Sequence, residues 1–385
     1  GAMWLLLVAA RWLGAGRFGA VAGALVAAVF PWSAWLGAAP VPEVPSAALS
    51  VVAMAALARE EARIRLLGAG AVAAACFCRY EAWPVAVAYA LVSLYDAFRA
   101  RERRVHWLAG GLALAPIALW LLHGVFIHGD ATFFWKRVAA YKAALGGDEP
   151  SLGERLFSVP RSLVVGEPEL FLGLVFVGLN AELRSRARRP MLAALSLLAF
   201  LAAGEVSGGG PTHHAGRAVL PVWYLMALLL GCAVEQRGAE RARRPYSWLA
   251  FALSLVGLGW IFRAGTPPAF ADRRDAVEIG ARARELGAPA LLIDSPDYSY
   301  LAVTAAFGRP NAAVAFDDRD PRHARASDPF VSASALAARA AERQDAWLVV
   351  TPEHLPLAAR LGTVRANNAS FALVATRGRA LVTEP

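Results

Sequence analysis

The segment Arg79-Tyr80-Glu81-Ala-Trp83 places an arginine beside a carboxylate and two aromatic rings. A guanidinium donates paired hydrogen bonds to phosphate oxygens, so Arg79 is a candidate phosphate-binding residue that Glu81 would orient, with Tyr80 in the same site. The same residues also suit a plain anchor at a membrane interface, where an ion pair and aromatic rings act without a ligand. Both interpretations stay open.

A second polar segment, residues 208–221, contains three glycines followed by His213, His214 and Arg217. Its flexible backbone and its imidazole and guanidinium donors suit phosphate oxygens. Neighbouring histidines on an extended loop point apart, so the pair predicts no metal site unless carboxylates come from elsewhere in the chain. A divalent metal is therefore allowed but not indicated, and an ordinary surface loop is the alternative.

Two further segments carry outward-facing charge. The run Phe133-Phe134-Trp135-Lys136-Arg137, close to Asp130, predicts an amphipathic helix at a membrane interface. Lys136 and Arg137 could contact lipid head groups, or the helix could serve only as an anchor. In Pro42-Glu43-Val-Pro45 an acid opens an apolar helix, where a negative charge is favourable without any further role.

These groups belong to a chain that is too apolar for a soluble globular protein. Of the 385 residues 57% are apolar and 18% are charged, and the mean hydropathy is +0.44, which predicts a membrane protein. The net charge of +9 indicates no nucleic-acid partner, because the arginines form clusters between apolar runs. The three cysteines also lie in apolar runs, so we expect buried thiols and no disulfides.

Ten apolar runs predict a polytopic protein of about ten helices, several shorter than the roughly 20 residues that a straight span needs. Arginine clusters fall at alternate connections, where 17 Arg accompany 7 acidic residues, whereas the opposite connections hold 8 Lys or Arg and 9 acidic residues. Cytoplasmic loops are enriched in Lys and Arg, so the first set is assigned to the cytoplasm. The runs are 4–10, 18–36, 44–58, 66–78, 82–98, 105–123, 167–181, 190–205, 218–234 and 246–262.

The polar break at residues 79–81 is interpreted as the outer turn of a helical hairpin. One long helix over 66–98 would put the arginines on either side of it on opposite faces of the membrane. Ten passes then divide the chain into a helical membrane domain, residues 1–265, and an extracytoplasmic or periplasmic domain, residues 266–385. The sequence thus predicts a multi-pass membrane protein.

The region 266–385 has balanced charge, with 14 Arg and 14 acidic residues, and reads as a small α/β domain. Strands alternating with helices predict a largely parallel sheet. The expected strands are 290–294, 314–317, 347–351 and 371–375, and the expected helices are 272–286, 299–307, 332–343 and 353–361.

Taken in order, these features resemble the polytopic GT-C glycosyltransferases, in particular the bacterial group like glycosyltransferase family 39 that is related to protein O-mannosyltransferases and the aminoarabinose transferase of lipid A. Residues 213–221 are similar to that family's His-x-x-Arg-Tyr-x-x-x-Pro pattern, with Ala218 in place of the tyrosine. The other matching pieces are Arg11-Trp-Leu-Gly-Ala-Gly-Arg17 before a span ending in Pro31, Glu43, the turn at residues 79–83, and the region 124–166.

The resemblance implies transfer of a sugar, usually with inversion, from a polyprenyl-phosphate carrier in the bilayer to an extracytoplasmic lipid, glycan or protein. It also implies a place in the bacterial inner membrane and a role in the cell envelope. Arg79 and Arg217, with His213 or His214, would hold the phosphate and stabilise its charge as it departs.

The family's catalytic base is an Asp in the outer loop that follows the first span. That span and loop are expected to precede the partial run 4–10, so the chain is expected to be N-terminally truncated and unable to catalyse by itself. Glu43, Glu81 and Asp130 are the outward acids that could substitute.

Two other classes of function stay as alternatives. A transporter of lipid-linked sugars would need charged or broken helices near the bilayer midplane, whereas the polar groups here gather at the outer surface. A non-catalytic assembly protein would bind a partner through its outer domain, where Asp294-Ser-Pro-Asp297 forms either a pocket or a simple loop cap.

Overall fold

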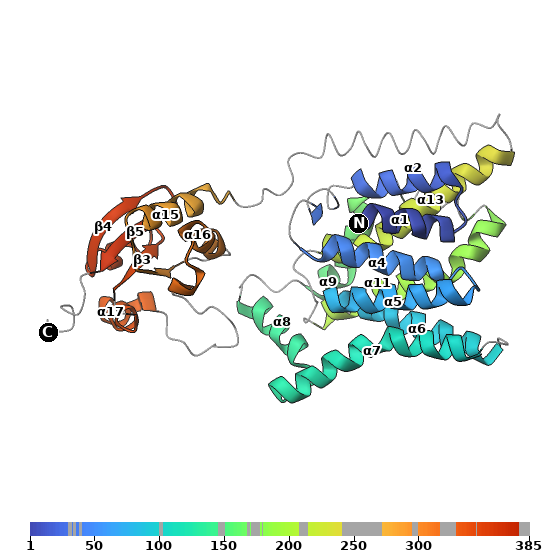
Figure 1. The fold of residues 1–385 in the computed structure, drawn as a ribbon, viewed down its shortest axis with the longest axis horizontal. Coiled ribbons are helices and arrows are strands. Elements are labelled where there is room, and N and C mark those ends of the chain that lie inside the picture. The colour runs from blue at the N-terminus through green and yellow to red at the C-terminus, as the bar shows by residue number, and fades with distance from the viewer. Residues whose placement is uncertain are drawn as a thin grey trace. The chain divides into compact units, whose positions relative to one another are not determined.

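In the computed structural model the chain forms two compact units, Gly1–Pro267 and Pro268–Pro385 (Figure 1). The predicted run 246–262 lies outside the described residues, as do most of 167–181 and both His213 and His214. The structure describes residues 1–29, 33, 36–37, 41–99, 103–144, 151–167, 170, 178, 180–207, 215–240, 272–294, 299–315, 329–343 and 345–376.

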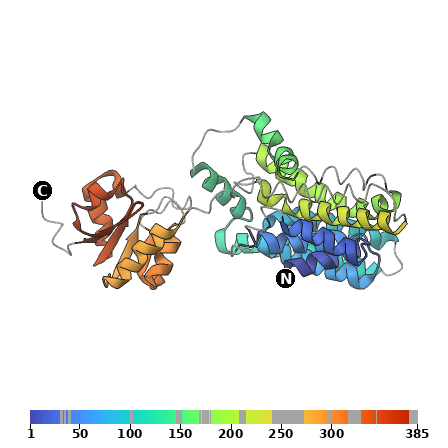
Figure 2. The same cartoon turned by 90° about the horizontal axis from the view of Figure 1, so that it is seen from above.

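The first unit is a bundle in which the long helices lie side by side (Figures 1 and 2). The most extensive packing joins α2 to α13, α4 to α5, and α6 to α7. A short 3-10 turn, Tyr80–Ala82, connects α5 to α6. The helices are α1 (Ala2–Trp12), α2 (Arg17–Val29), α4 (Glu43–Ala56), α5 (Ala62–Cys78), α6 (Trp83–Arg99), α7 (Arg103–His128), α8 (Phe133–Ala144), α9 (Leu152–Gly166), α11 (Ala181–Val206), α12 (Ala215–Ala218) and α13 (Leu220–Glu240).

Two of these helices, α7 and α11, are long and apolar enough to cross a membrane, judged by length and composition over the described part of the chain. Apolar helices of 10 to 17 residues add α1, α2, α4 and the segment Leu220–Ala233 of α13. Ten membrane passes therefore stay a prediction. Large apolar side chains such as Phe126, Phe98 and Leu91 lie exposed on the bundle, as expected of a surface that faces lipid.

Small residues let α2 and α13 approach at the level of the backbone. A Cβ atom added to Gly231 would collide with the carbonyl oxygen of Gly19, and one added to Gly23 would lie 3.0 Å from the carbonyl oxygen of Ala227. Inside a bilayer no hydrophobic force drives helices together, so small residues that allow close approach are a common basis for helix packing.

The hairpin predicted around residues 79–81 is confirmed. Nη2 of Arg65, in the first turn of α5, donates to Oδ2 of Asp96, near the end of α6, at 2.9 Å, so the two helices run antiparallel. Asp96 also accepts two hydrogen bonds from Arg189 of α11. Two of the predicted arginine clusters thus meet at Asp96, just before the cluster at residues 99–104, and we call this end of the bundle the arginine end.

Three details differ from the predictions. The arginines at 184–189 lie within the first turns of α11 and not in a connection between helices. The region 124–166 contains a second helix, α9, which begins with a capping box between Ser151 and Glu154. Cys76 and Cys232 are buried as expected, but Cys78, the last residue of α5, is exposed.

The second unit is built on a five-stranded sheet of order β2-β1-β3-β5-β4. The strands are β1 (Ala290–Ile293), β2 (Ala313–Ala315), β3 (Ala346–Val350), β4 (Gly362–Asn367) and β5 (Ala372–Thr376), and the helices are α15 (Arg274–Glu285), α16 (Ser299–Phe307), α17 (Ala333–Ala341) and α18 (Leu355–Ala358). β1 pairs in parallel with β2 and β3, but β5 pairs antiparallel with β3 and β4. The expectation of a largely parallel sheet was therefore wrong for the half that contains β5 and β4.

Side chains alternate between the two faces of this sheet. Leu291 and Ile293 of β1 belong to an apolar cluster with α15 and α16, whereas Leu292 belongs to a cluster with α17. A strand covered on both faces buries every side chain and reads as a continuous apolar run, which explains why β1 and β3 were visible in the sequence.

Candidate anion-binding site

Arg79, in the turn between α5 and α6, is held by two carboxylates. Its Nη1 lies 2.6 Å from Oε1 of Glu43, at the start of α4. Its Nε and Nη2 donate to the two carboxylate oxygens of Glu81, at 3.0 and 2.5 Å. This paired contact fixes the plane of the guanidinium, which is the orienting role predicted for Glu81.

Arg217, in α12, joins the same group from a distant part of the sequence. Its Nη1 lies 3.7 Å from the same Oε1 of Glu43 that accepts from Arg79. That distance allows electrostatic attraction but exceeds the length of a hydrogen bond. The structure therefore brings together four of the predicted site residues, Glu43, Arg79, Glu81 and Arg217.

The burial of these side chains decides which of them can meet a ligand. Glu43 and Glu81 are 5% and 6% exposed, whereas Arg79 is 22% exposed and Arg217 is 34% exposed. Oε2 of Glu43 is buried and has no hydrogen-bond partner among the described residues. The acids thus form the floor of the site, and the arginines form its accessible surface.

Two arginines and two acids leave this group close to neutral. Burial by itself would lower the pKa of Arg79, but the hydrogen bonds and charge of Glu81, together with the charge of Glu43, raise that pKa overall. Burial and the charge of Glu81 also raise the pKa of Tyr80, so its phenol stays protonated at neutral pH. An anion that binds here must compete with Glu43 for Arg217, whose ion pair is the looser one.

The segment with Lys136 and Arg137 forms α8, which contacts the Arg79 turn. The ring of Phe134 lies 4.9 Å from the ring of Trp83 in an edge-to-face arrangement and 6.0 Å from that of Tyr80. Lys136 and Arg137 are both exposed, and among the described residues neither forms a hydrogen bond or an ion pair with Glu43 or Glu81.

Asp130 lies outside the group around Arg79, in the turn before α8. It forms an ion pair with Lys136 at 2.5 Å and accepts hydrogen bonds from the backbone and hydroxyl of Thr132, each at 2.8 Å. Lys136, followed by Thr132, lowers the pKa of Asp130 to about 2. These contacts explain Asp130 as a residue that orders the turn.

A second polar cluster lies in the C-terminal unit, where the sequence suggested only a pocket or a loop cap at Asp294. Asp294 follows β1 and is 1% exposed. Its Oδ2 accepts from the backbone and hydroxyl of Thr351, at 3.1 and 2.9 Å, and lies 2.7 Å from Nδ1 of His354. Thr351 follows β3, so the cluster joins the carboxyl ends of two neighbouring parallel strands. The contacts were not predictable, because Thr351 and His354 carry no motif.

No group of three or more His, Cys, Asp or Glu side chains within the described parts of the chain has a geometry that could hold a metal ion.

No family model matches the chain, and no curated protein matches it. Among solved structures it is similar to the crystal structure of ArnT from Cupriavidus metallidurans bound to undecaprenyl phosphate. The TM-score is 0.63 with 14% sequence identity, and the alignment covers 100% of this chain and 83% of that one. The chain therefore shares the fold of ArnT, the GT-C-like fold that the sequence led us to expect.

Proposed function

We propose that the protein is a membrane glycosyltransferase that moves a sugar from a polyprenyl-phosphate carrier to an extracytoplasmic acceptor. The observation that carries this proposal is the convergence of Arg79 and Arg217 on one carboxylate oxygen of Glu43. The fold shared with ArnT, a protein solved with undecaprenyl phosphate, supports the same class of donor.

In this proposal Arg217 is the residue that binds the donor phosphate. It is the more exposed arginine, and its 3.7 Å separation from Glu43 is easily exchanged for hydrogen bonds to phosphate oxygens. Arg79, fixed by Glu81, supplies a second positive charge in a set position. His213 and His214 stay predicted as further donors.

The chemistry that this arrangement supports is a displacement at the anomeric carbon of the sugar. The bond from that carbon to the phosphate oxygen breaks, and a bond to the acceptor hydroxyl oxygen forms as the hydroxyl proton passes to a base. Negative charge then accumulates on the departing phosphate, where Arg217 and Arg79 stabilise it more than in the ground state. Glu43 and Glu81 position the guanidinium of Arg79.

The proposed sidedness follows from the two ends of the bundle. Asp96 binds arginines from two predicted cytoplasmic clusters, whereas Glu43 and Arg79 lie at the opposite ends of α4 and α5. Applied to these two ends, the positive-inside rule puts the arginine end in the cytoplasm and the site around Arg79 at the outer surface of the inner membrane.

The test compares Arg217→Ala with Arg184→Ala in the full chain purified in detergent. Arg184 is an exposed arginine at the arginine end, so it controls for loss of one charge. We expect Arg217→Ala to weaken the binding of undecaprenyl phosphate by at least about tenfold, since hydrogen bonds to charged groups contribute about 1.5–3 kcal/mol. Native mass spectrometry measures the bound fraction, and the thermal midpoint shows that each variant is folded.

A second assay follows the release of free polyprenyl phosphate from a polyprenyl-phosphate sugar in membranes that contain the protein. Release by the native chain, lost in Arg217→Ala and kept in Arg184→Ala, supports transfer. Unchanged carrier binding by Arg217→Ala removes this residue from the site. Binding without release is also expected of a chain that lacks the catalytic loop, so it favours the assembly-protein alternative only when the complete protein gives the same result in membranes that supply acceptors.

A further inference from the structure

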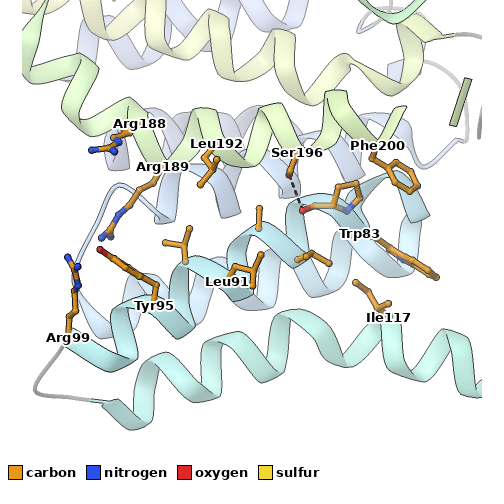
Figure 3. A pocket seen from close by; sticks show the side chains of 14 residues that line it. Trp83, Leu91, Tyr95, Arg99, Ile117, Arg188, Arg189, Leu192, Ser196 and Phe200 are labelled. Atoms are coloured by element: carbon orange, nitrogen blue, oxygen red, sulfur yellow. Dashed lines mark hydrogen bonds between the residues drawn. The ribbon is translucent and has the colours of Figure 1, made fainter. Parts of the chain in front are cut away.

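A groove outside the site around Arg79 runs between α6, α7 and α11 (Figure 3). Its volume is about 950 Å³, and its walls are mainly apolar, with Val87, Leu91, Ile117 and Leu192 among them. A space of this size within a helical bundle accommodates a long hydrocarbon chain of a lipid.

The two ends of the groove differ in chemistry, as Figure 3 shows. Trp83 and Phe200 lie at one end, whereas Arg99, Arg188 and Arg189 lie at the other, which is the arginine end of the bundle. The 17 residues of α6 extend from one end to the other. At 1.5 Å per residue this is about 25 Å, close to the roughly 30 Å thickness of a bilayer core.

The walls of the groove are fixed to one another near both ends. The hydroxyl of Ser196 in α11 donates to the carbonyl oxygen of Pro84 in α6 at 3.0 Å. Toward the other end, Arg189 of α11 donates two hydrogen bonds to Asp96 of α6, at 3.0 and 2.8 Å. Two walls of the groove, α6 and α11, are therefore joined to each other near both ends.

Positive charge exceeds negative charge at the arginine end of the groove. Asp96 is shared by Arg65 and Arg189, which already outnumber it. Arg99 stacks on the ring of Tyr95 at 4.3 Å, and no acid among the described residues forms an ion pair with it. Arg188 is exposed, and the described residues include no partner for its guanidinium.

We propose that the groove binds an anionic phospholipid of the surrounding bilayer, with an acyl chain between α6, α7 and α11 and the phosphate on Arg99 and Arg188. Basic pockets between helices at the cytoplasmic face recognise acidic head groups by this combination of apolar wall and arginine. Zwitterionic head groups lack the net negative charge that these two arginines favour, since neither pairs with an acid in the part of the chain that the structure describes. The proposed phosphate position is separate from the donor site around Arg217, because Arg99 and Arg188 lie at the arginine end of the groove.

The test measures lipid binding to the full chain by native mass spectrometry in detergent. Phosphatidylglycerol and phosphatidylcholine with identical acyl chains are titrated separately. We expect phosphatidylglycerol to bind the native chain at least about tenfold more tightly, and the double variant R99Q/R188Q to lose that preference. The matched control R104Q/R184Q removes two exposed arginines that do not line the groove, and it should keep the preference.

A third variant, Leu91→Trp, fills the apolar part of the groove and should weaken both lipids without changing the preference between them. Equal affinity of the native chain for the two lipids would overturn the proposal. So would an equal loss in R104Q/R184Q, or displacement of bound phosphatidylglycerol by undecaprenyl phosphate, which would make the groove part of the donor site. If Arg217→Ala fails its own test while the lipid preference persists, only the proposed transferase function is lost.

Discussion

At the scale of single residues, Glu43 has the largest structural effect in the candidate site. The sequence allowed it to be a helix-start acid or a substitute catalytic acid, and the structure shows its carboxylate between Arg79 and Arg217. Replacing it by glutamine keeps the size of the side chain and removes the charge that attracts both guanidinium groups.

We therefore expect Glu43→Gln to lower the free energy of unfolding by about 1–3 kcal/mol, since a buried charge loses one of its partners while Glu81 still holds Arg79. The control is Glu182→Gln, which breaks an exposed pair with Arg186 and should cost less than about 1 kcal/mol. Thermal unfolding in detergent measures both. Equal midpoints for the two variants would show that Glu43 contributes no more than a surface pair.

The pairing of Arg79 with Glu81 could be predicted because the two residues are neighbours in the sequence. The network of Arg65, Asp96 and Arg189 could not, since each arginine belongs to a cluster that looks like ordinary cytoplasmic surface charge. Only the three-dimensional meeting of α5, α6 and α11 shows that one acid joins two clusters. Spacing along the chain holds no information about such a contact.

At the scale of helices and strands, apolar runs predicted most of the elements, and partly polar elements were missed. The strand β4 was not predicted, because most of its side chains are exposed and its sequence has no apolar run. The helix expected at 353–361 is shorter in the structure, where α18 spans Leu355–Ala358. The helix α9 was missed because it mixes Arg155, Arg161 and Pro160 with its apolar residues. An element without a continuous apolar face is defined mainly by its neighbours.

The packing of α2 against α13 gives a prediction for this scale. Gly231→Val places side-chain atoms where the backbone of Gly19 lies, and we expect it to lower the stability of the bundle by about 1–3 kcal/mol. The control is Gly70→Val in α5, because a Cβ atom at Gly70 has no other atom within 4 Å. Midpoints of thermal unfolding compare the two. A Gly231→Val midpoint at or above that of Gly70→Val would contradict the close approach of the two helices.

At the scale of the whole molecule, the distribution of charge predicted more than the total charge did. The hairpin at Arg79 followed from keeping the arginine clusters on one side, and the Arg65–Asp96 contact confirms it. The resemblance already assigned Arg79 and Arg217 to one phosphate, but the place of Glu43 between them was not predicted, because Arg217 reaches Glu43 through the docking of α12. The number of membrane passes depends on short runs, for which apolar length is a weak guide.

The two compact units lead to a prediction about independent folding. The sheet of the C-terminal unit is covered on both faces by its own helices, so residues 268–385 alone should give mixed α/β circular dichroism and a cooperative melt. Within that fragment, Asp294→Asn should lower stability by about 2–3 kcal/mol, because the buried carboxylate accepts from Thr351 and contacts His354. The exposed Asp272→Asn is the control and should change it little. A broad, non-cooperative melt of the native fragment would contradict independent folding.

The shared carboxylate of Glu43 also has a consequence for how the chain is made. Synthesis proceeds from the N-terminus, so Glu43, Arg79 and Glu81 emerge long before Arg217. Helices α4, α5 and α6 can therefore assemble with Arg79 already paired to two carboxylates, and this pairing lowers the cost of placing an arginine close to the bilayer. The group then carries one negative charge in excess. That excess charge is left for a later cation to compensate. The order of translation thus leaves a negatively charged surface on which α12 can dock, and Arg217 neutralises that charge only after the second half of the bundle has been made.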